Sequence, residues 1–363
     1  MQFDRLKRRD FMTLLGGAVA WPLAARAQQP HRVLGVLMAY TESDPLARAW
    51  IAALRQGLGQ AGWVIDRNLH LEHRWAGGDL ERMRRFASEL VALKPDVILA
   101  VTTPVTAAVR RETSKIPIIF VIVSDPVGSG FVTTLAHPGG NVTGFINIEE
   151  SMGGKWLEML KEAAPNLRHA AIMFNPDTAP GNGDYFVRPF EAASQVLKIN
   201  SISAPVRSPG EIENAVANLA KVPDGGLVVM TDSFMFVHRK QVMALTERYK
   251  LPAIFPSGAQ AREGGLLGYG PKYPDQFRRS ASYIDRVLRG ESPATLPVQV
   301  PIKFELVINL KIAKTLGFEL PWFPATRRRG DRITTLVAAP AHSRLWHQAA
   351  RAYASAMSAA GGS

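Results

Sequence analysis

Two hydroxyl side chains stand beside a predicted helix start in the stretch "VTTPVTAAV", at residues 101–109 of this 363-residue chain. Thr102 and Thr103 follow an apolar run and precede a proline, which is common in the first turn of a helix. The first backbone N–H groups of a helix have no partner within it, so a neighbouring hydroxyl completes a site that suits a carboxylate. The alternative role of Thr103 is to cap its own helix, and the two roles are compatible.

A carboxylate and two aromatic rings are candidates to hold the other parts of a small molecule. Asp232 follows the apolar run "GGLVVM" and is a candidate partner for a ligand ammonium, with helix capping as its alternative role. Tyr40 and Tyr269 are candidates to cover an apolar ligand group, with packing inside the protein as the alternative. Asp125 opens the glycine-rich "DPVGSG", which favours a turn or hinge role over ligand contact. The same strand-end reasoning gives the full set of candidate ligand-binding residues as Tyr40, Thr41, Thr102, Thr103, Ser124, Asp125, Asn175, Thr231, Asp232, Ser233, Ser257 and Tyr269.

The elements that must position these residues read as alternating strands and helices. Short runs rich in Val, Ile and Leu, such as 32–38, 96–101 and 116–123, are each followed by a segment with helical spacing. This pattern indicates a parallel sheet covered on both faces, and it begins again at 169–175. The sequence therefore predicts an α/β fold with two Rossmann-like lobes. In open parallel sheets ligands bind beyond the carboxyl ends of the strands, where the candidate residues fall.

Several other chemistries lack the residues they need. The chain has no cysteine, which removes disulfides, thiolate catalysis and cysteine-based zinc sites. His70 and His73 are three apart on a predicted strand, so they point to opposite faces and we expect no metal site there. No G-x-S-x-G motif or complete dinucleotide fingerprint occurs, and we expect no cofactor. An α/β enzyme that acts on a small molecule in the same crevice is the alternative function.

The net charge of +12 is concentrated near the two ends of the chain. Residues 1–27 contribute +3 and residues 327–363 contribute +5, which leaves +4 for the body. That charge is ordinary for a folded surface, so we expect no nucleic-acid partner.

The first residues match an export signal. Arg8 and Arg9 precede an apolar stretch that is broken by Gly16, Gly17 and Pro22, so it is too short for the roughly 20 residues of a spanning helix. The following Ala-Arg-Ala fits a signal-peptidase site, and the paired arginines resemble a twin-arginine signal. We expect residues 1–27 to be a signal peptide. Because no cysteine follows, we expect a periplasmic protein without a lipid anchor.

Two long stretches carry a resemblance to a known family. The segments "IPIIFVIVSDPVGSGFVTTLAHPGGNVTGF" (116–145) and "GGLLGYGPKYPDQFRRSASYIDRVLRGESPATLPVQVPIKFELVINLKIAKTLGFELP" (264–321) resemble the ABC-transporter substrate-binding family that includes tryptophan-binding lipoproteins. The resemblance covers roughly residues 31–322. It implies a type I periplasmic binding protein, monomeric, whose lobes close about a hinge on a small ligand and pass it to an ABC permease.

The resemblance also implies a division of the chain into two lobes, whereas the class of ligand rests on the candidate residues themselves. Lobe 1 is expected to comprise 31–147 plus about 265–292, and lobe 2 is expected to comprise 148–264 plus about 293–322. The strand-end hydroxyls, Asp232 and the tyrosines together suit an amino acid or a related small carboxylate.

The C-terminal region departs from the family pattern after about Phe323. The sequence reads "PATRRRGDRITT", whereas relatives end on a segment like Arg-Ala-Asp-Glu-Val-Ile-Glu. Suitable codons for this stretch, shifted by one base, would encode that family-like ending. We therefore expect residues 324–363 to be an out-of-frame, disordered extension.

Overall fold

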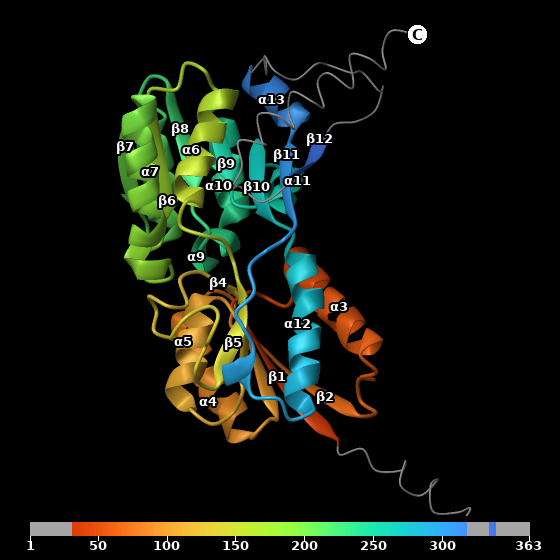
Figure 1. Ribbon diagram of the computed structural model, residues 1–363. Coiled ribbons are helices and arrows are strands. Elements are labelled where there is room, and N and C mark those ends of the chain that lie inside the picture. Colours follow the sequence, from red (N-terminus) through yellow and green to blue (C-terminus); the bar gives the residue numbers. More distant parts are fainter. Residues whose placement is uncertain (1–30, 318–333, 339–363) are drawn as a thin grey trace, which may run out of the picture.

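The computed structural model describes residues 31–317 and the strand β12 (Thr334–Ala338). The chain forms two α/β lobes, drawn one above the other in Figure 1. The predicted signal peptide lies outside the described residues, as does most of the predicted tail. Among the residues that are described, no helix combines the length and apolar character needed to cross a membrane.

Lobe 1 is built on a five-stranded parallel sheet with the order β2-β1-β3-β4-β5. Its central strands are buried along their whole length because helices cover both faces of the sheet. Its elements up to the first crossing are β1 (Arg32–Met38), α3 (Pro45–Gln60), β2 (Leu69–Trp75), α4 (Leu80–Ala92), β3 (Val97–Val101), α5 (Thr103–Glu112), β4 (Ile118–Val123) and β5 (Val142–Ile146).

Lobe 2 is built on a seven-stranded sheet with the order β12-β11-β10-β9-β8-β6-β7. The strands are β6 (His169–Phe174), β7 (Asn200–Pro205), β8 (Gly225–Val229), β9 (Ala253–Phe255), β10 (Leu267–Pro271), β11 (Phe304–Ile308) and β12. The helices are α6 (Met152–Ala163), η1 (Pro180–Gly183), α7 (Asp184–Leu197), α8 (Pro209–Leu219), α9 (Ser233–Val237), α10 (Arg239–Arg248), α11 (Gly258–Glu263) and α13 (Leu310–Leu316).

The prediction of two Rossmann-like α/β lobes is confirmed, with a difference at one edge of the second sheet. Strands β11 and β12 run antiparallel to their neighbours, whereas the other strand pairs of this sheet are parallel. Strand β12 belongs to the tail that the sequence analysis expected to be disordered. Its Thr, Leu and Val residues suit a strand, and β11 offers it an edge with which to pair.

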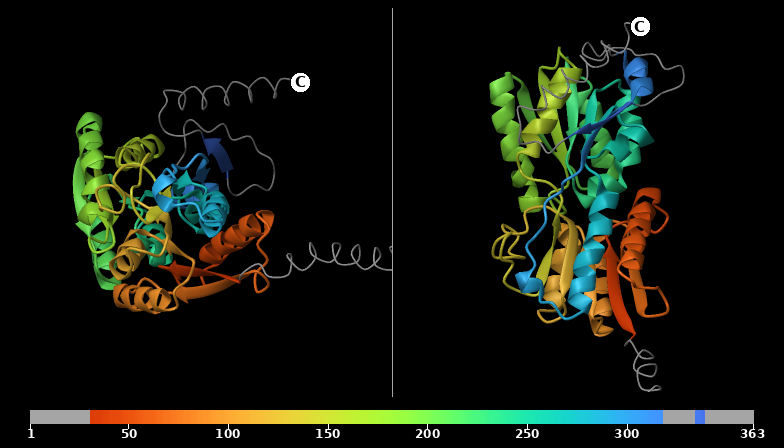
Figure 2. Two further views of the ribbon diagram at one scale, coloured as in Figure 1. Left: turned by 60° about the horizontal axis from the view of Figure 1, so that its bottom comes forward. Right: turned by 45° about the vertical axis from the view of Figure 1, so that its right-hand side comes forward.

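The chain passes between the lobes three times. The first crossing follows β5, and the second lies between β10 and α12 (Tyr273–Leu288), which packs against α3 in lobe 1. Figure 2 shows α12 and α3 side by side in both of its views. The chain then continues through η2 (Pro293–Thr295) along β5, where residue 299 bridges to residue 145, and returns to lobe 2 before β11.

These crossings differ from the expected division of the chain. The segment from about 265 was expected in lobe 1, but β10 pairs with β9 and β11 in lobe 2, so the crossing falls near Lys272. The segment from about 293 was expected in lobe 2, but Leu296 and Val298 are buried in the core of lobe 1.

Each lobe has its own apolar core. The core of lobe 1 surrounds β1, β3 and β4 and includes residues of α12. In lobe 2 the helices α6 and α7 pack closely on one face of the sheet, where Trp156, Phe186 and Phe190 are buried. Separate cores allow each lobe to keep its structure while the angle between the lobes changes.

Candidate ligand-binding site

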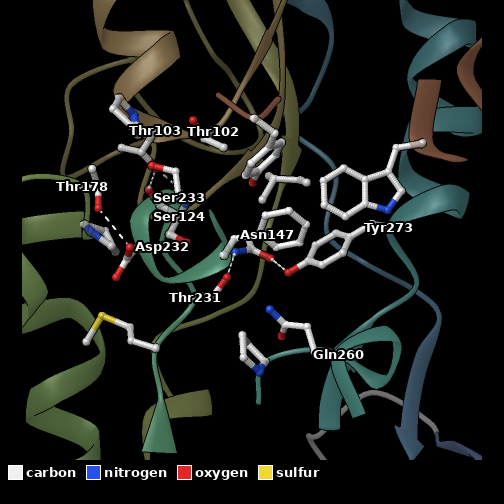
Figure 3. A pocket seen from close by; sticks show the side chains of 18 residues that line it. Thr102, Thr103, Ser124, Asn147, Thr178, Thr231, Asp232, Ser233, Gln260 and Tyr273 are labelled. Atoms are coloured by element: carbon white, nitrogen blue, oxygen red, sulfur yellow. Dashed lines mark hydrogen bonds between the residues drawn. The ribbon is translucent and has the colours of Figure 1, made fainter. Parts of the chain in front are cut away.

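A pocket lies between the lobes, at the carboxyl ends of strands from both sheets. It encloses about 480 Å³ of space, including its mouth. Figure 3 shows the labelled polar side chains on one side of this space and along its lower part, with Tyr273 on another side. The lining residues are Tyr40, Trp50, Thr102, Thr103, Pro104, Ile122, Ser124, Asn147, Thr178, Pro180, Met230, Thr231, Asp232, Ser233, Phe236, Pro256, Gln260 and Tyr273.

Most of the residues selected from the sequence line this pocket. From lobe 1 these are Tyr40, Thr102, Thr103 and Ser124, and from lobe 2 they are Thr231, Asp232 and Ser233. They converge because each follows a strand, or begins the helix after it, at the same edge of its sheet.

The other five candidates lie outside the lining. Thr41 is exposed, and Asp125 accepts a hydrogen bond from the Gly128 N–H in a turn, which is the structural role favoured for it. Tyr269 is buried in the core of lobe 2 beside Phe304, which matches the packing alternative.

The two remaining candidates, Asn175 and Ser257, form hydrogen bonds to residues that line the pocket. The backbone N–H of Asn175 donates to the Asp232 carboxylate at 3.0 Å. The Ser257 hydroxyl donates to Gln260 at 3.4 Å.

Thr102 presents a buried hydroxyl without a partner at the end of β3. Its Oγ1 makes no hydrogen bond among the described residues, although the side chain is almost fully buried. Its φ of 94° and ψ of 160° lie in a region that favours glycine. Ile122, also in the lining, has a φ of 60° where the pairing of β4 with β5 shifts register. Strained residues of this kind cost about 1–3 kcal/mol each and cluster at ligand clamps.

The start of α5 is open toward the pocket. Thr102 is its N-cap residue and makes no side-chain capping hydrogen bond, and Thr103 is the first residue of the helix, so the alternative role of Thr103 as a cap is not seen. Thr103 Oγ1 instead contacts the main chain of Ser124, at 3.2 Å from its N and 3.4 Å from its O. This contact joins the ends of β3 and β4, and it leaves the first-turn N–H groups of α5 without a side-chain acceptor.

Asp232 is held by donors from three parts of lobe 2. Oδ1 accepts from the Met235 N–H at 2.8 Å, which caps α9, and from the Thr178 hydroxyl at 3.0 Å. Oδ2 accepts the Asn175 N–H and, as a carboxylate oxygen, can accept a further donor. Burial raises the pKa of this carboxyl from 3.8 to about 6, against the opposing effect of its hydrogen bonds. No protein cation compensates this buried charge in the contacts of the described residues.

An aromatic cluster forms the middle of the site. Phe236 extends from α9 of lobe 2 into the core of lobe 1, where its ring centroid is 4.4 Å from that of Tyr40 and 5.2 Å from that of Trp50. Tyr273, at the start of α12, packs against Trp50 at 5.2 Å. Burial raises the pKa of the Tyr40 hydroxyl well above its usual value.

A hydrogen-bond chain joins two crossing segments to lobe 2. The Tyr273 hydroxyl donates to Asn147 Oδ1 at 2.9 Å, and Asn147 Nδ2 donates to Thr231 Oγ1 at 2.8 Å. Figure 3 shows both bonds at the floor of the pocket. Asn147 follows β5, so it also lies at a strand end.

Arg239 connects the two lobes beside the pocket. Its guanidinium is 2% exposed and donates to Asp44 of lobe 1 at 2.7 Å. It also makes a bidentate pair with Glu263 of lobe 2, at 2.6 and 3.0 Å. Asp44 in turn caps α3 through its other oxygen. The structure therefore has the lobes closed against each other.

The sequence reasoning missed several lining residues. Asn147 could have been found by the strand-end rule, since it directly follows an apolar run. Trp50 lies inside a helix, and Phe236 and Gln260 lie within short helices after the strand ends, so the rule does not reach them.

Two α/β lobes that close a mixed polar and aromatic pocket between their strand ends define a bilobal solute-binding protein. The chain belongs to the ABC transporter substrate binding protein family, whose model matches residues 38–321. Membership makes it a binding protein rather than an enzyme, so the alternative of an enzyme in the same cleft is not supported.

Named relatives are similar over most of the chain. A tyrosine-binding protein of Clostridioides difficile is 26% identical over 295 residues, covering 80% of this chain and 82% of the relative. A Streptococcus pneumoniae ABC domain in complex with L-Trp is 25% identical with a TM-score of 0.73, covering 80% of this chain and 96% of that one. A ligand-free, open structure of a Clostridium difficile substrate-binding protein with adhesive properties is also 25% identical, with a TM-score of 0.60, covering 82% and 97%.

Proposed function

We propose that this chain binds a free aromatic amino acid in the interlobe pocket and delivers it to an ABC permease. The observation that carries the proposal is the unpartnered Thr102 hydroxyl beside the open start of α5, facing a pocket that also contains the uncompensated Asp232. An α-amino acid is a zwitterion. The hydroxyl and helix start would attract its carboxylate, and Asp232 would attract its ammonium.

The carboxylate of the ligand is assigned to lobe 1. A buried hydroxyl that lacks a partner carries a cost, which an incoming acceptor removes. The α5 N-terminus adds N–H donors and the positive end of the helix dipole. Ser233 of lobe 2 presents a second buried hydroxyl in the same pocket that has no partner among the described residues. A carboxylate between Thr102 and Ser233 would accept from both lobes.

The ammonium of the ligand is assigned to Asp232. Oδ2 can accept a further donor, and no cation contacts this carboxylate among the described residues. The pKa of about 6 leaves the group mostly ionised at neutral pH. A charge-assisted hydrogen bond between an ammonium and this carboxylate would offset the cost of its burial.

The side chain of the ligand is assigned to the aromatic cluster of Tyr40, Trp50, Phe236 and Tyr273. Ring stacking adds about 0.5–1.5 kcal/mol to the burial of apolar area. Relatives named for tyrosine and L-Trp support an aromatic amino acid over a sugar.

Closure of the lobes is the proposed response to the ligand. The site draws its donors from both lobes, so the contacts are complete only when the lobes meet. The overlap is better with the relative in complex with L-Trp than with the ligand-free, open relative, which supports a closed arrangement here. Export to the periplasm by the signal peptide predicted in residues 1–27 would fit this role, because the permease accepts solute on that side of the inner membrane.

A thermal-shift screen tests the proposal. The panel contains L-tyrosine, L-tryptophan, L-leucine, galactose and adenosine. A ligand at a hundredfold excess over its dissociation constant adds about 2.7 kcal/mol of stability, which a melting curve registers. We expect the aromatic amino acids to shift the melt most. A shift with galactose or adenosine and none with the amino acids would contradict the assigned ligand class.

Two analogues then test the ends of the site separately. Tyramine lacks the carboxylate, and 3-(4-hydroxyphenyl)propionate lacks the ammonium. We expect both to bind more weakly than L-tyrosine. In Thr102→Val the affinity for L-tyrosine should fall, while the affinity for tyramine should change little. An equal loss for both compounds would remove Thr102 from the carboxylate end.

A further inference from the structure

Gln260 has an amide donor that no described part of the protein uses. The residue lies on α11 and is 2% exposed, with its side chain in the lining of the pocket. Its Oε1 accepts the Ser257 hydroxyl at 3.4 Å, which holds the amide in place. No hydrogen bond from Nε2 to another described residue occurs. Figure 3 shows this nitrogen directed into the pocket.

The position of Gln260 separates it from the groups assigned to the ligand's charged end. In Figure 3 it lies at the opposite end of the pocket from Thr102 and Thr103. The polar groups nearest to it in that view, Thr231, Asn147 and Tyr273, are already bonded to one another. Gln260 is therefore the polar group left available at this end. A ligand held by its carboxylate and ammonium at the other end would turn its side chain toward it.

We propose that Gln260 determines specificity by donating a hydrogen bond to the phenolic hydroxyl oxygen of the ligand, so that the site prefers tyrosine to phenylalanine. The proposal rests on the proposed function, which places an aromatic amino acid in this pocket. A phenol oxygen accepts the Nε2–H, whereas the ring of phenylalanine has no acceptor and leaves the donor unpaired. An indole N–H only donates, so it does not pair with this nitrogen.

The expected preference follows from the cost of a donor that a bound ligand covers without giving it a partner. That cost corresponds to about a 10- to 100-fold difference in dissociation constant between two ligands that differ by one hydroxyl. A site that hydrogen-bonds a ligand hydroxyl strongly rejects the analogue without that hydroxyl. An apolar pocket that distinguishes ligands by size alone is much less selective.

Isothermal titration of the full chain with L-tyrosine, L-phenylalanine and L-tryptophan tests the proposal. The wild type should bind tyrosine about 10- to 100-fold more tightly than phenylalanine. In Gln260→Met, which keeps the length of the side chain and removes its polar atoms, that ratio should fall close to one through loss of tyrosine affinity. Thr102→Val is the matched variant at the charged end, and it should weaken all three ligands and leave the ratio unchanged.

The outcomes separate this proposal from the proposed function. If the wild type binds none of the three amino acids, the assigned ligand class is wrong and the role of Gln260 fails with it. If all three bind but tyrosine and phenylalanine bind equally, or tryptophan binds most tightly, the proposed function stands and the role of Gln260 is refuted. The wild-type ratio decides this even if Gln260→Met does not fold. A folded Gln260→Met that keeps the wild-type ratio also refutes it.

Discussion

The ion pair between Arg239 and Asp44 crosses from one lobe to the other, so it should contribute to the closed state alone. Asp44→Asn is the sharpest perturbation of it. One side-chain oxygen remains to cap α3 through the Leu46 and Ala47 N–H groups, while the charge that meets Arg239 is removed. The substitution therefore leaves the helix start intact and changes the contact between the lobes.

The free energy by which Asp44→Asn should shift the balance between the closed and open forms depends on the burial of the ion pair and on the second partner of Arg239. Removing one member of a buried, hydrogen-bonded charge pair costs about 2–5 kcal/mol. Arg239 keeps its bidentate contact with Glu263, so we expect the lower end, about 2 kcal/mol, in the balance between closed and open forms. That corresponds to about a 30-fold shift of this equilibrium toward the open form.

The assay combines ligand affinity with molecular dimensions. Asp44→Asn should weaken the binding of L-tyrosine by up to about 30-fold, because only the closed form completes the site. It should also raise the ligand-free radius of gyration in X-ray scattering. Asp79→Asn is the control, since Asp79 caps α4 in the same lobe and forms no ion pair with lobe 2 among the described residues. If the two variants share the affinity and radius of the wild type, the ion pair does not hold the lobes together.

Two further predictions concern pH and packing. The pKa of Asp232 is raised to about 6 in the free protein, so the contribution of Asp232 to folding stability declines as the pH rises through 6. The ionised carboxylate binds an ammonium, so ligand affinity should increase about tenfold between pH 5 and 7. Titration calorimetry at several pH values checks this, and Asp232→Asn should bind weakly and without that dependence. Gly153→Ala should lower the free energy of unfolding by several kcal/mol, because the added Cβ would lie 2.1 Å from the Phe186 carbonyl oxygen. Gly59→Ala, with open space around its Cβ, should raise it by about 0.5–1 kcal/mol, and urea denaturation compares the two.

The strand-end part of the site could be predicted from the sequence because it depends on local pattern. A buried run such as 97–101 ends where its apolar residues end, and a parallel sheet brings all such ends to one edge. Thr102 and Asp232 were therefore placed in the pocket by a rule that needs no knowledge of packing. The same rule selected Tyr269, which the register of β10 instead directs into the core of lobe 2.

The rest of the site depends on contacts between the lobes. Phe236 is an ordinary apolar residue of a short helix, and only the meeting of the lobes brings it against Tyr40 and Trp50. The crossing near Lys272 was expected too early because the glycines of "GGLLGYGP" favour a loop, while the backbone of β10 pairs on both sides. The β11 partners lie 33 to 41 residues further along the chain, so they leave no local signal, and these tertiary contacts override the loop propensity of the glycines.

Helix α12 comes late in the sequence but packs in the N-terminal lobe, which affects folding during synthesis. The Trp63 indole donates to Asp285, 222 residues further on, where α12 packs on α3. As the chain leaves the ribosome, lobe 1 lacks this helix and the apolar side of α3 stays uncovered until most of the protein has been synthesised. The strands β6 to β10 are continuous in sequence, so the second lobe can complete most of its sheet earlier. Neither lobe is complete before its late elements are made, because lobe 1 needs α12 and lobe 2 needs β11. The apolar side of α3 is synthesised early, so it stays uncovered for most of synthesis and should need a chaperone.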